Sequence, residues 1–347
     1  MNKSCLIGFL MCSAFSLVVQ AATDGAHITK TISQIERKKG IKRTIQYRPD
    51  GNDFVCVNGK NRYTRALYGG ITDFRIETSD RPVFAAYKPK DSKHICFRLQ
   101  CGNQSIALDS LKFCEARYRA GRRTYRLTDP LLGKGELNIS VLAFPDAEGG
   151  IWRFTMKDMP EGALLHCYIS EIRAKNLSRN GDMGADRADS FDAPQLPKEQ
   201  KHYKLSLDGT TAYIVVEDQE LRLPALVEGT SLYDKSEKWR SEIESSLQIS
   251  TPDPYFNPLG GALAAAADGI WDGKIWLHGA IGWRSQLNGW RAAYIGDFIG
   301  WHDRARTHFD SYAASQVTDV PATIPHPTQD TALHLARSVK KWGTPHY

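Results

Sequence analysis

Alternating apolar and polar residues dominate the chain from about residue 41 to residue 250. Short runs rich in β-branched and aromatic residues recur there between turn-forming residues, as in DFVCVNG (53–59), HICFRLQ (94–100) and GELNISVLAF (135–144). A period of two residues is typical of half-buried strands. At least ten such segments without helical periods between them predict an antiparallel β-sandwich domain over residues 23–250.

Turn signals inside this region predict how some strands connect. Ala120-Gly121 divides LKFCEARYRAGRRTYRLTD (111–129) into two strands. Asp208-Gly209 in HYKLSLDGTTAYIVVED (202–218) has the composition of a tight turn with positive φ angles, which predicts a hairpin. Residues 176–200 are polar and rich in turn-forming residues, so we expect a long exposed loop there.

The pattern changes at the proline-rich segment TPDPYFNPLG, and we assign a linker to residues 251–258. Asn257 is a favourable N-cap and Pro258 suits the first position of a helix. LGGALAAAADGIW then predicts a helix whose apolar face carries Leu259, Leu263 and Ile270.

Two more helices are predicted in the remainder of the 259–347 segment. One covers residues 297–317, with Trp301, Ala305 and Phe309 at helical spacing. The other follows Thr328, its expected cap, through QDTALHLARSVKKW. Because each helix is apolar on one face, the helices must pack on the sandwich or on helices of a longer domain.

The first 22 residues have the features of a secretory signal peptide. Lys3 precedes an apolar run, and the small residues Val19 and Ala21 stand before the expected cleavage point. The apolar run is too short for a comfortable membrane span, and no later segment resembles one. We therefore expect an exported protein of the periplasm or cell surface without a membrane span.

Charge and cysteine content argue against a nucleic-acid-binding protein and against a disulfide-rich or metal-binding fold. The net charge of +6 comes from basic residues spread along the chain, whereas nucleic-acid binding favours a concentrated patch. Five cysteines follow the leader, and we interpret them as buried small hydrophobic residues; one disulfide involving Cys96, Cys101 or Cys114 is an open alternative. The sequence contains no metal-binding or nucleotide-binding motif, so no metal and no cofactor is expected.

The segment GWRSQLNGWRAAYIGDFIGWHD (282–303) combines tryptophan, glycine and charged residues. Flat aromatic faces, small residues and convergent polar groups are typical of a ligand cleft, and they suit a sugar. The predicted substrate-binding residues are Trp283, Arg284, Asn288, Trp290, Arg291, Trp301, His302 and Asp303. In the alternative interpretation, the rings wedge the helices against the sandwich.

Asp297 is the candidate catalytic residue of this segment. Glycoside hydrolysis requires two carboxyl groups, about 6.5–9.5 Å apart in inverting enzymes. Asp303 would point elsewhere on the same helix and suits an ion pair with Arg306, so Asp297 has no convincing second carboxylate. Asp297 could equally be a helix N-cap, and His302 is either a proton shuttle or a hydrogen-bonded core histidine.

Residues 268–317 resemble the start of the barrel in large exported glycosidase-like proteins of gut Bacteroidetes, an uncharacterised family within the six-hairpin glycosidase superfamily. RALYGG (65–70), residues 121–144 and GGIWRF (149–154) are similar to the N-terminal sandwich of that family. The resemblance implies a supersandwich-like β-sandwich followed by the first helices of an (α/α)6 toroid that acts on glycans. A complete toroid needs more helices than this chain supplies, which implies an N-terminal part of a larger enzyme with a missing C-terminal helical region and an incomplete catalytic pair.

Two hypotheses about function follow. The first is a glycoside hydrolase-like protein that acts on a polysaccharide or oligosaccharide. The second is a non-catalytic carbohydrate-binding or surface-assembly β-sandwich protein. In both, the partner is a carbohydrate.

Overall fold

The computed structural model of the protein describes residues 46–88, 92–171, 202–279, 289–314, 328–330 and 335–337. The expected signal peptide and the expected loop at 176–200 lie outside these residues. So do three of the predicted sugar-binding residues, Trp283, Arg284 and Asn288.

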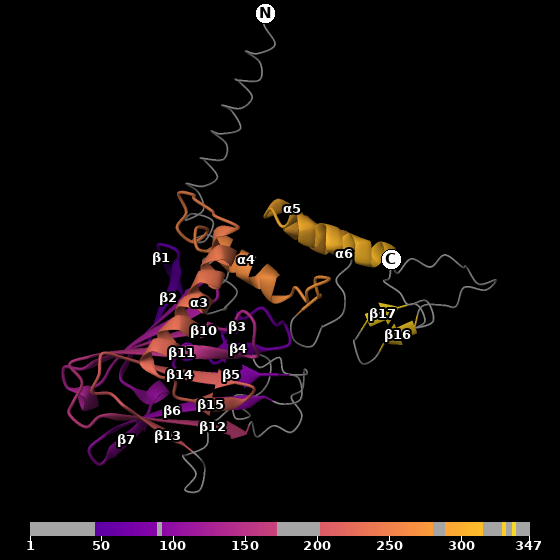
Figure 1. Ribbon diagram of the computed structural model, residues 1–347. Coiled ribbons are helices and arrows are strands. Elements are labelled where there is room, and N and C mark those ends of the chain that lie inside the picture. The colour runs from indigo at the N-terminus through magenta and orange to yellow at the C-terminus, as the bar shows by residue number, and fades with distance from the viewer. Residues whose placement is uncertain are drawn as a thin grey trace, which may run out of the picture.

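Two antiparallel sheets form the main body of the protein (Figure 1). The eight-stranded sheet has the order β1-β2-β8-β9-β10-β11-β14-β15, with bounds Arg48–Asp50, Asp53–Val57, Phe113–Arg119, Arg122–Thr128, Glu136–Ala143, Gly149–Lys157, Thr211–Glu217 and Glu220–Arg222. The seven-stranded sheet has the order β13-β12-β6-β5-β4-β3, with bounds Tyr203–Ser206, Leu164–Glu171, Lys93–Cys101, Phe84–Tyr87, Arg75–Thr78 and Arg65–Tyr68, and β7 (Gln104–Ala107) also pairs with β6. Short 3-10 turns, η1 (Leu108–Ser110) and η2 (Pro130–Leu132), connect β7 to β8 and β9 to β10.

The apolar residues of the alternating pattern meet between the two sheets. Phe84 and Phe97 of the seven-stranded sheet contact Trp152 of the eight-stranded sheet with ring centroids 5.7 and 6.2 Å apart. Phe154 lies 5.5 Å from Phe97 in an edge-on arrangement, a favoured geometry for aromatic pairs. The predicted antiparallel β-sandwich is therefore confirmed.

One predicted hairpin is wrong. β13 pairs with β12 in one sheet, whereas β14 pairs with β11 in the other. The chain crosses between the sheets around Asp208 and Gly209, neither of which takes a positive φ angle. Alternation cannot reveal this crossing, because each strand presents an apolar face to the same shared core.

Helix α3 (Leu226–Ser245) covers the outer face of the eight-stranded sheet and was not predicted (Figure 1). Its buried residues follow helical spacing, but they are Gly229, Tyr233, Ser236 and Arg240. Tyr233 packs in a small cluster with residues such as Ile151 and Val215. Because the buried stripe contains only one large apolar residue, hydrophobic periodicity could not detect the helix.

Helix α4 (Leu259–Gly269) forms where predicted, but it buries a different face. Leu263 is 54% exposed, whereas Gly260, Ala264 and Gly269 are buried. A Cβ at Gly269 would lie 2.3 Å from the Tyr68 ring, so close packing on β3 selects small residues. The predicted cap is also wrong, since Pro258 occupies the N-cap position and the Asn257 side chain bonds to Thr251 instead.

The predicted helix over 297–317 is divided between α5 (Gly289–Phe298) and α6 (His302–Ala314). Gly300 adopts a φ of 81° in the break between the two helices, a conformation that glycine tolerates best. Ala305 and His308 are buried on α6, while Phe309 is 48% exposed. The expected apolar face of this helix is thus only partly correct.

The helix predicted after Thr328 is wrong in its described parts. Residues Thr328–Asp330 (β16) and Leu335–Arg337 (β17) form a two-stranded antiparallel pair. Within the described residues, no helix has the length and apolar character needed to cross a membrane.

The five described cysteines are free thiols, and four of them are buried. Burial raises the pKa of Cys96 and of Cys114 to about 12, so both stay protonated at neutral pH. The interpretation of these cysteines as buried small hydrophobic residues is confirmed for four of the five, and the alternative of a disulfide is wrong for all five.

Candidate functional site

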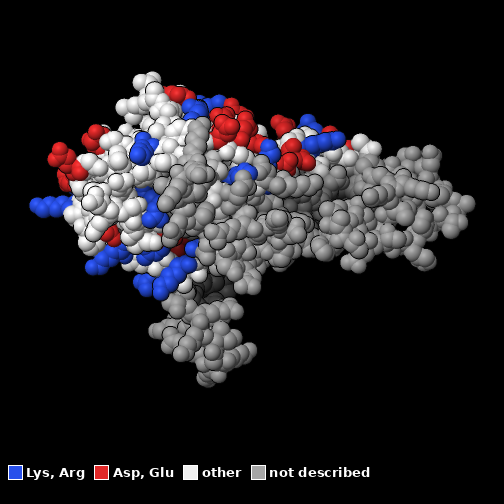
Figure 2. Space-filling model, turned by 90° about the horizontal axis from the view of Figure 1, so that it is seen from below, with Lys and Arg blue, Asp and Glu red and all other residues white. Residues whose placement is uncertain are grey.

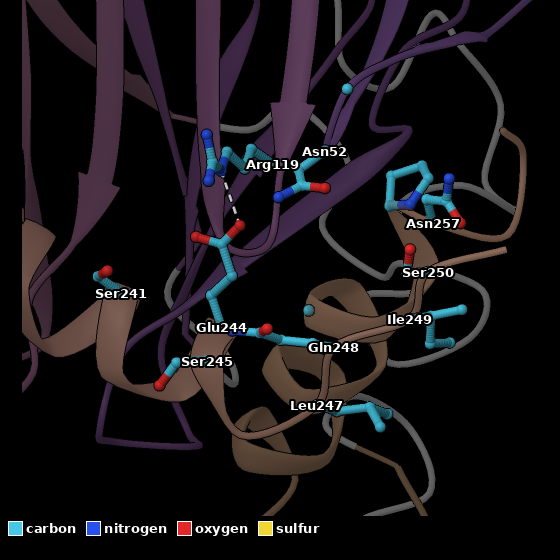
Figure 3. Close-up of a pocket in the computed structure, with 13 residues that line it drawn as sticks. Asn52, Arg119, Ser241, Glu244, Ser245, Leu247, Gln248, Ile249, Ser250 and Asn257 are labelled. Carbon is cyan, nitrogen blue, oxygen red and sulfur yellow. Dashed lines mark hydrogen bonds and ion pairs between the residues drawn. The ribbon is translucent and has the colours of Figure 1, made fainter.

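A cavity of about 460 Å³ lies where the sandwich meets the helical segment (Figure 3). Its walls come from the turn between β1 and β2, the end of β8, the last turn of α3 and the start of α4. The lining residues are Gly51, Asn52, Arg119, Ser241, Glu244, Ser245, Leu247, Gln248, Ile249, Ser250, Asn257, Pro258 and Gly261.

Local sequence explains how these residues converge. A two-residue turn joins β1 to β2, and Gly51 takes a positive φ of 59° there, which presents Asn52 at the rim. Gly260 allows α4 to approach the chain leaving α3, since a Cβ at Gly260 would lie 2.6 Å from the Leu247 carbonyl oxygen. The cavity therefore depends on one glycine in a turn with positive φ and on another at a close approach between chain segments.

Two arginines hold Glu244 in the cavity wall. Arg119 donates from Nε to Glu244 Oε1 at 2.7 Å, and Arg240 donates to Glu244 Oε2 at 2.8 Å. Burial works to raise the pKa of Glu244, but the hydrogen bonds from Arg119 and Arg240 outweigh burial and hold the pKa below its usual value. Glu244 is thus an ionised structural group, poorly suited to act as a general acid.

Several polar side chains in the cavity remain available to a ligand. Asn52, Gln248 and Ser241 are exposed, and their side chains make no hydrogen bond to another described residue. Asn257 differs, because its amide bonds three times to Thr251 and so closes the segment between α3 and α4. The available groups are neutral donors and acceptors.

One residue of the predicted sugar site lies next to this cavity. Trp301 donates from Nε1 to Ser246 Oγ at 3.2 Å, and Ser246 stands between the lining residues Ser245 and Leu247. The guanidinium of Arg304 lies 4.3 Å from the Trp301 ring and also donates to buried Asp268 at 2.7 Å. Trp301 is therefore half-buried in a polar and aromatic contact between α6, α4 and the end of α3.

Trp276 has a purely structural environment. It is fully buried, donates from Nε1 to the Ala267 carbonyl oxygen at 3.0 Å, and its backbone N donates to His308 Nδ1 at 3.1 Å. A Cβ at Gly296 would lie 2.4 Å from the Trp276 ring. This ring packs between helices α4, α5 and α6, which differs from the alternative interpretation that tryptophan rings wedge the helices against the sandwich.

The candidate catalytic residue Asp297 occupies the last turn of α5, so it is not a helix N-cap. Its side chain is 72% exposed and accepts a hydrogen bond from His302 Nδ1 at 2.9 Å. His302 is 67% exposed, which excludes a core histidine. Asp303 lies in the first turn of α6, where a carboxylate is favourable near the helix N-terminus.

The structure thus brings together only part of the predicted set. Asp297 and His302 are in contact, and Trp301 and Asp303 lie beside them in the chain. Trp290 and Arg291 lie on α5, of which only the backbone is described at these positions. The cavity residues Asn52, Ser241 and Gln248 gave no signal in the sequence, because single polar residues in turns and helix ends are common.

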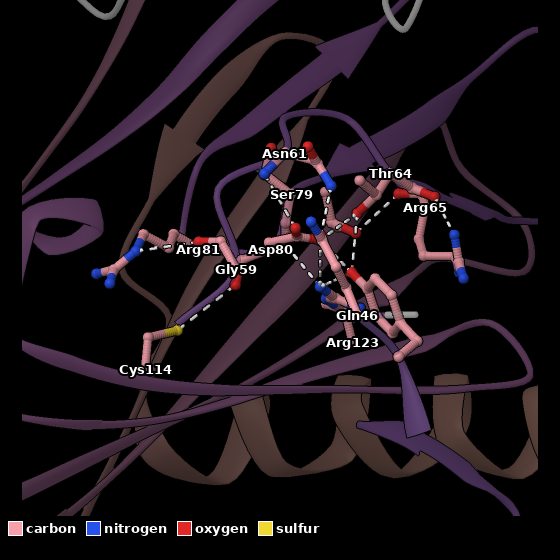
Figure 4. Close-up of polar contacts among 12 residues, drawn as sticks. Gln46, Gly59, Asn61, Thr64, Arg65, Ser79, Asp80, Arg81, Cys114 and Arg123 are labelled. Atoms are coloured by element: carbon pink, nitrogen blue, oxygen red, sulfur yellow. Dashed lines mark hydrogen bonds and ion pairs between the residues drawn. The ribbon is translucent and has the colours of Figure 1, made fainter. Parts of the chain in front are cut away.

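A second polar cluster is sealed inside the sandwich (Figure 4). Asp80 and Arg123 are both fully buried, 3.9 Å apart, and Tyr47 bonds to each of them. Arg123 also donates to the Ser79 carbonyl oxygen at 2.8 Å. Because the charged side chains of Asp80 and Arg123 are not exposed, we assign this cluster a structural role, in which it links β9, the end of β4 and the segment before β1.

Comparison with known proteins adds a match over the sandwich. Residues 89–216 match the model of a family described as a domain of unknown function (DUF4450). The matched region extends from just before β6 to the end of β14. No curated protein sequence matches the chain. Among the described residues, no three His, Cys, Asp or Glu side chains are grouped so that they could hold a metal ion.

Proposed function

We propose that this protein binds carbohydrate and that the cavity between the sandwich and the helices receives a sugar unit. The observation that carries this proposal is the set of uncommitted neutral side chains, Asn52, Gln248 and Ser241, in one cavity. Its volume of about 460 Å³ falls within the roughly 300–1,000 Å³ of small-molecule sites. An exported protein of the periplasm or cell surface would meet such ligands as polysaccharides.

The charge balance of the cavity favours a neutral ligand. The Glu244 carboxylate is matched by Arg119 and Arg240, so the wall carries no unpaired negative charge among its described residues. Arg119 bonds through Nε, which leaves its terminal amino groups for hydroxyl oxygens. Leu247, Ile249 and Pro258 add apolar surface that suits the C–H face of a pyranose.

Removal of the free amides tests this function. The double substitution Asn52→Ala with Gln248→Ala should weaken the binding of a neutral polysaccharide about tenfold, since each hydrogen bond contributes about 0.5–1.5 kcal/mol. Affinity electrophoresis of the full chain in gels with dextran, xylan or soluble starch measures the change as lost retardation.

Gln104→Ala on the exposed end of β7 is the matched control, because it removes an amide far from the cavity. Equal retardation of the double variant and this control would exclude the cavity as the binding site.

Glycoside hydrolysis is a second candidate function. The favouring observation is Asp297, an exposed carboxylate bonded to His302 at the junction of α5 and α6. The resemblance to glycosidase-like proteins would make α4, α5 and α6 the first helices of an (α/α)6 toroid. In that arrangement, Trp283, Arg284, Asn288, Trp290 and Arg291 would line the cleft together with Trp301 and Asp303.

Substitution of Asp297 tests the hydrolase. Asp297→Asn should abolish the release of reducing ends from any polysaccharide that the unaltered protein cleaves, while an exposed site keeps Tm within a few degrees. His302→Gln should reduce the rate less. A variant Asp297→Asn that retains full activity would exclude this carboxylate from catalysis, and an unaltered protein without hydrolysis would leave carbohydrate binding as the function.

A further inference from the structure

Three basic side chains form a row across the outer face of the seven-stranded sheet. In the strand register, Arg98 of β6 faces His166 of β12, and His166 faces Lys204 of β13. Their chain neighbours Leu99 and Leu165 pack in the core, so the three side chains lie on the opposite face. Since adjacent strands are about 4.8 Å apart, the row spans about 10 Å.

Two side chains of the row, Arg98 and Lys204, are cations on either side of His166. None of the three side chains forms an ion pair with a described Asp or Glu. Arg98 donates from Nε and Nη2 to the Ser105 hydroxyl and carbonyl oxygens of β7 at 3.4 and 3.3 Å. The His202 ring lies 5.5 Å from the His166 ring. Arg98 and Lys204 repel each other across the strand that carries His166. Such an arrangement is stabilised when an anion binds to it.

His166 gives an independent indication of a missing ligand. It is only 7% exposed, and its Nε2 bonds to Gln100 Oε1 at 2.6 Å. Its Nδ1 is buried and has no hydrogen-bond partner. An unsatisfied buried polar group is destabilising, and a protonated Nδ1 could donate to an anionic oxygen.

Burial and three neighbouring basic side chains oppose that protonation. Burial lowers the pKa of His166, and His202, Lys204 and Arg98 lower it further. The groups facing this ring are therefore Arg98 and Gln100 from β6, Lys204 from β13, and His202. A bound anion would reverse their effect and draw a proton onto the ring.

A hollow of about 360 Å³ adjoins the row on the same face of the sheet. Arg98 belongs to both, and the hollow is also lined by Arg62, His94, Asp109, Ser110 and Tyr168. A sugar ring in this hollow would place an acidic substituent within reach of Arg98. The hollow therefore favours a bulky anion with hydroxyl groups over a simple ion.

We propose that Arg98, His166 and Lys204 bind the carboxylate or sulfate group of an acidic polysaccharide. The carbohydrate class of this ligand rests on the proposed function, whereas the anion site rests on the row itself. Nucleic acid is disfavoured because its binding uses many phosphate contacts over a wide basic surface, and this row is about 10 Å long.

Affinity electrophoresis of the full chain tests the site in gels with polygalacturonate, dextran sulfate or plain dextran, at pH 6 and at pH 8. The acidic gels should retard the protein more at pH 6, because His166 must be protonated to donate from Nδ1. His166→Gln with Lys204→Gln should weaken binding about tenfold in at least one acidic gel. Polygalacturonate and dextran sulfate distinguish a carboxylate ligand from a sulfate ligand.

Lys238→Gln is the matched control, since Lys238 is an exposed cation on α3, on the other side of the sandwich. The proposal is overturned if the double variant and this control migrate alike in both acidic gels, if retardation is independent of pH, or if single-stranded DNA binds as tightly as the acidic polysaccharides.

The cavity variant Asn52→Ala with Gln248→Ala separates the two proposals. The anion site alone is overturned if the cavity variant loses retardation by dextran while the His166 and Lys204 double variant is retarded normally in the acidic gels. An absence of retardation in every gel overturns both proposals.

Discussion

At the residue scale, Glu244 links the sandwich to the helices through Arg119 and Arg240. Its pKa is lowered in the folded protein, so its stabilising effect is present above the unfolded pKa and is lost as pH falls through the folded pKa. Glu244→Gln should cost about 1–3 kcal/mol of unfolding free energy at pH 7, because it removes a charged acceptor from two arginines. The cost should shrink as pH falls below the unfolded pKa of about 4.3 and toward the lowered pKa of the folded protein, since the unaltered side chain is then increasingly protonated.

Urea unfolding at pH 7 and at pH 3.5 measures this difference. Glu242→Gln is the control, since Glu242 is exposed on the same helix. If the difference in unfolding free energy between the Glu244 variant and the unaltered protein is the same at both pH values, the charge of Glu244 does not stabilise the fold as assigned.

At the element scale, the contact of α3 with the eight-stranded sheet depends on Gly229. A Cβ at this position would lie 2.4 Å from two ring atoms of Tyr213 and 2.7 Å from its Cβ. Gly229→Ala should therefore destabilise the protein by about 1–3 kcal/mol, although alanine in a helix interior is normally favoured over glycine by about 1 kcal/mol. Thermal unfolding measures the change.

Ser231→Ala is the matched substitution at an exposed position of the same helix, where the higher helix propensity of alanine should leave Tm unchanged or raise it. An equal rise of Tm in both variants would mean that α3 does not pack closely on Tyr213.

At the scale of the whole molecule, most of the described core belongs to the sandwich. Helices α5 and α6 contact each other and extend beyond α4 (Figure 1), and the large apolar side chains Tyr294, Ile295, Phe298 and Phe309 on them are exposed. The packing of apolar residues thus stabilises mainly the sandwich, whereas α6 is attached to α4 through specific polar contacts such as the ion pair of Arg304 with Asp268.

The charges of the molecule are also unevenly arranged. Figure 2 shows Asp and Glu side chains crowded along one edge of the view, with Lys and Arg side chains more frequent along the opposite edge. The two proposed sites also differ in charge, since the cavity beside α3 has paired charges, whereas Arg98 and Lys204 on the seven-stranded sheet form no ion pair with a described carboxylate. Binding at the row should therefore respond to salt more than binding at the cavity.

The sequence predicts those features of the protein that a local pattern of apolar residues encodes, and it misses those that contacts with distant residues select. Strands such as 53–57 and 136–143 could be assigned because alternation reports directly which face of a strand is buried. Helix α3 could not, because its buried stripe of Gly229, Tyr233, Ser236 and Arg240 is selected by the neighbouring sheet and not by hydrophobicity. Leu263 shows the converse, an apolar residue left exposed because α4 packs through its small residues.

The candidate sites also divide into residues that lie close together in the sequence and residues that only the fold brings together. The tryptophan-rich segment drew attention to Trp301, Asp297 and His302, which the structure places at one helix junction. Asn52, Gln248 and the row of Arg98, His166 and Lys204 come from separate strands and turns. No spacing along the chain marks them, because the pairing of strands decides which distant residues become neighbours.

The sequence by itself determined the antiparallel β-sandwich, the helix that begins at Leu259 and the burial of four of the five described cysteines, since local periodicity and composition encode these features. Only the tertiary structure decided that β13 and β14 lie in different sheets, that α3 packs through Gly229 and Tyr233, and which polar side chains meet in a cavity or in a row. The physical reason is that register, close approach and charge pairing depend on contacts between residues far apart in the chain, which a local pattern does not contain.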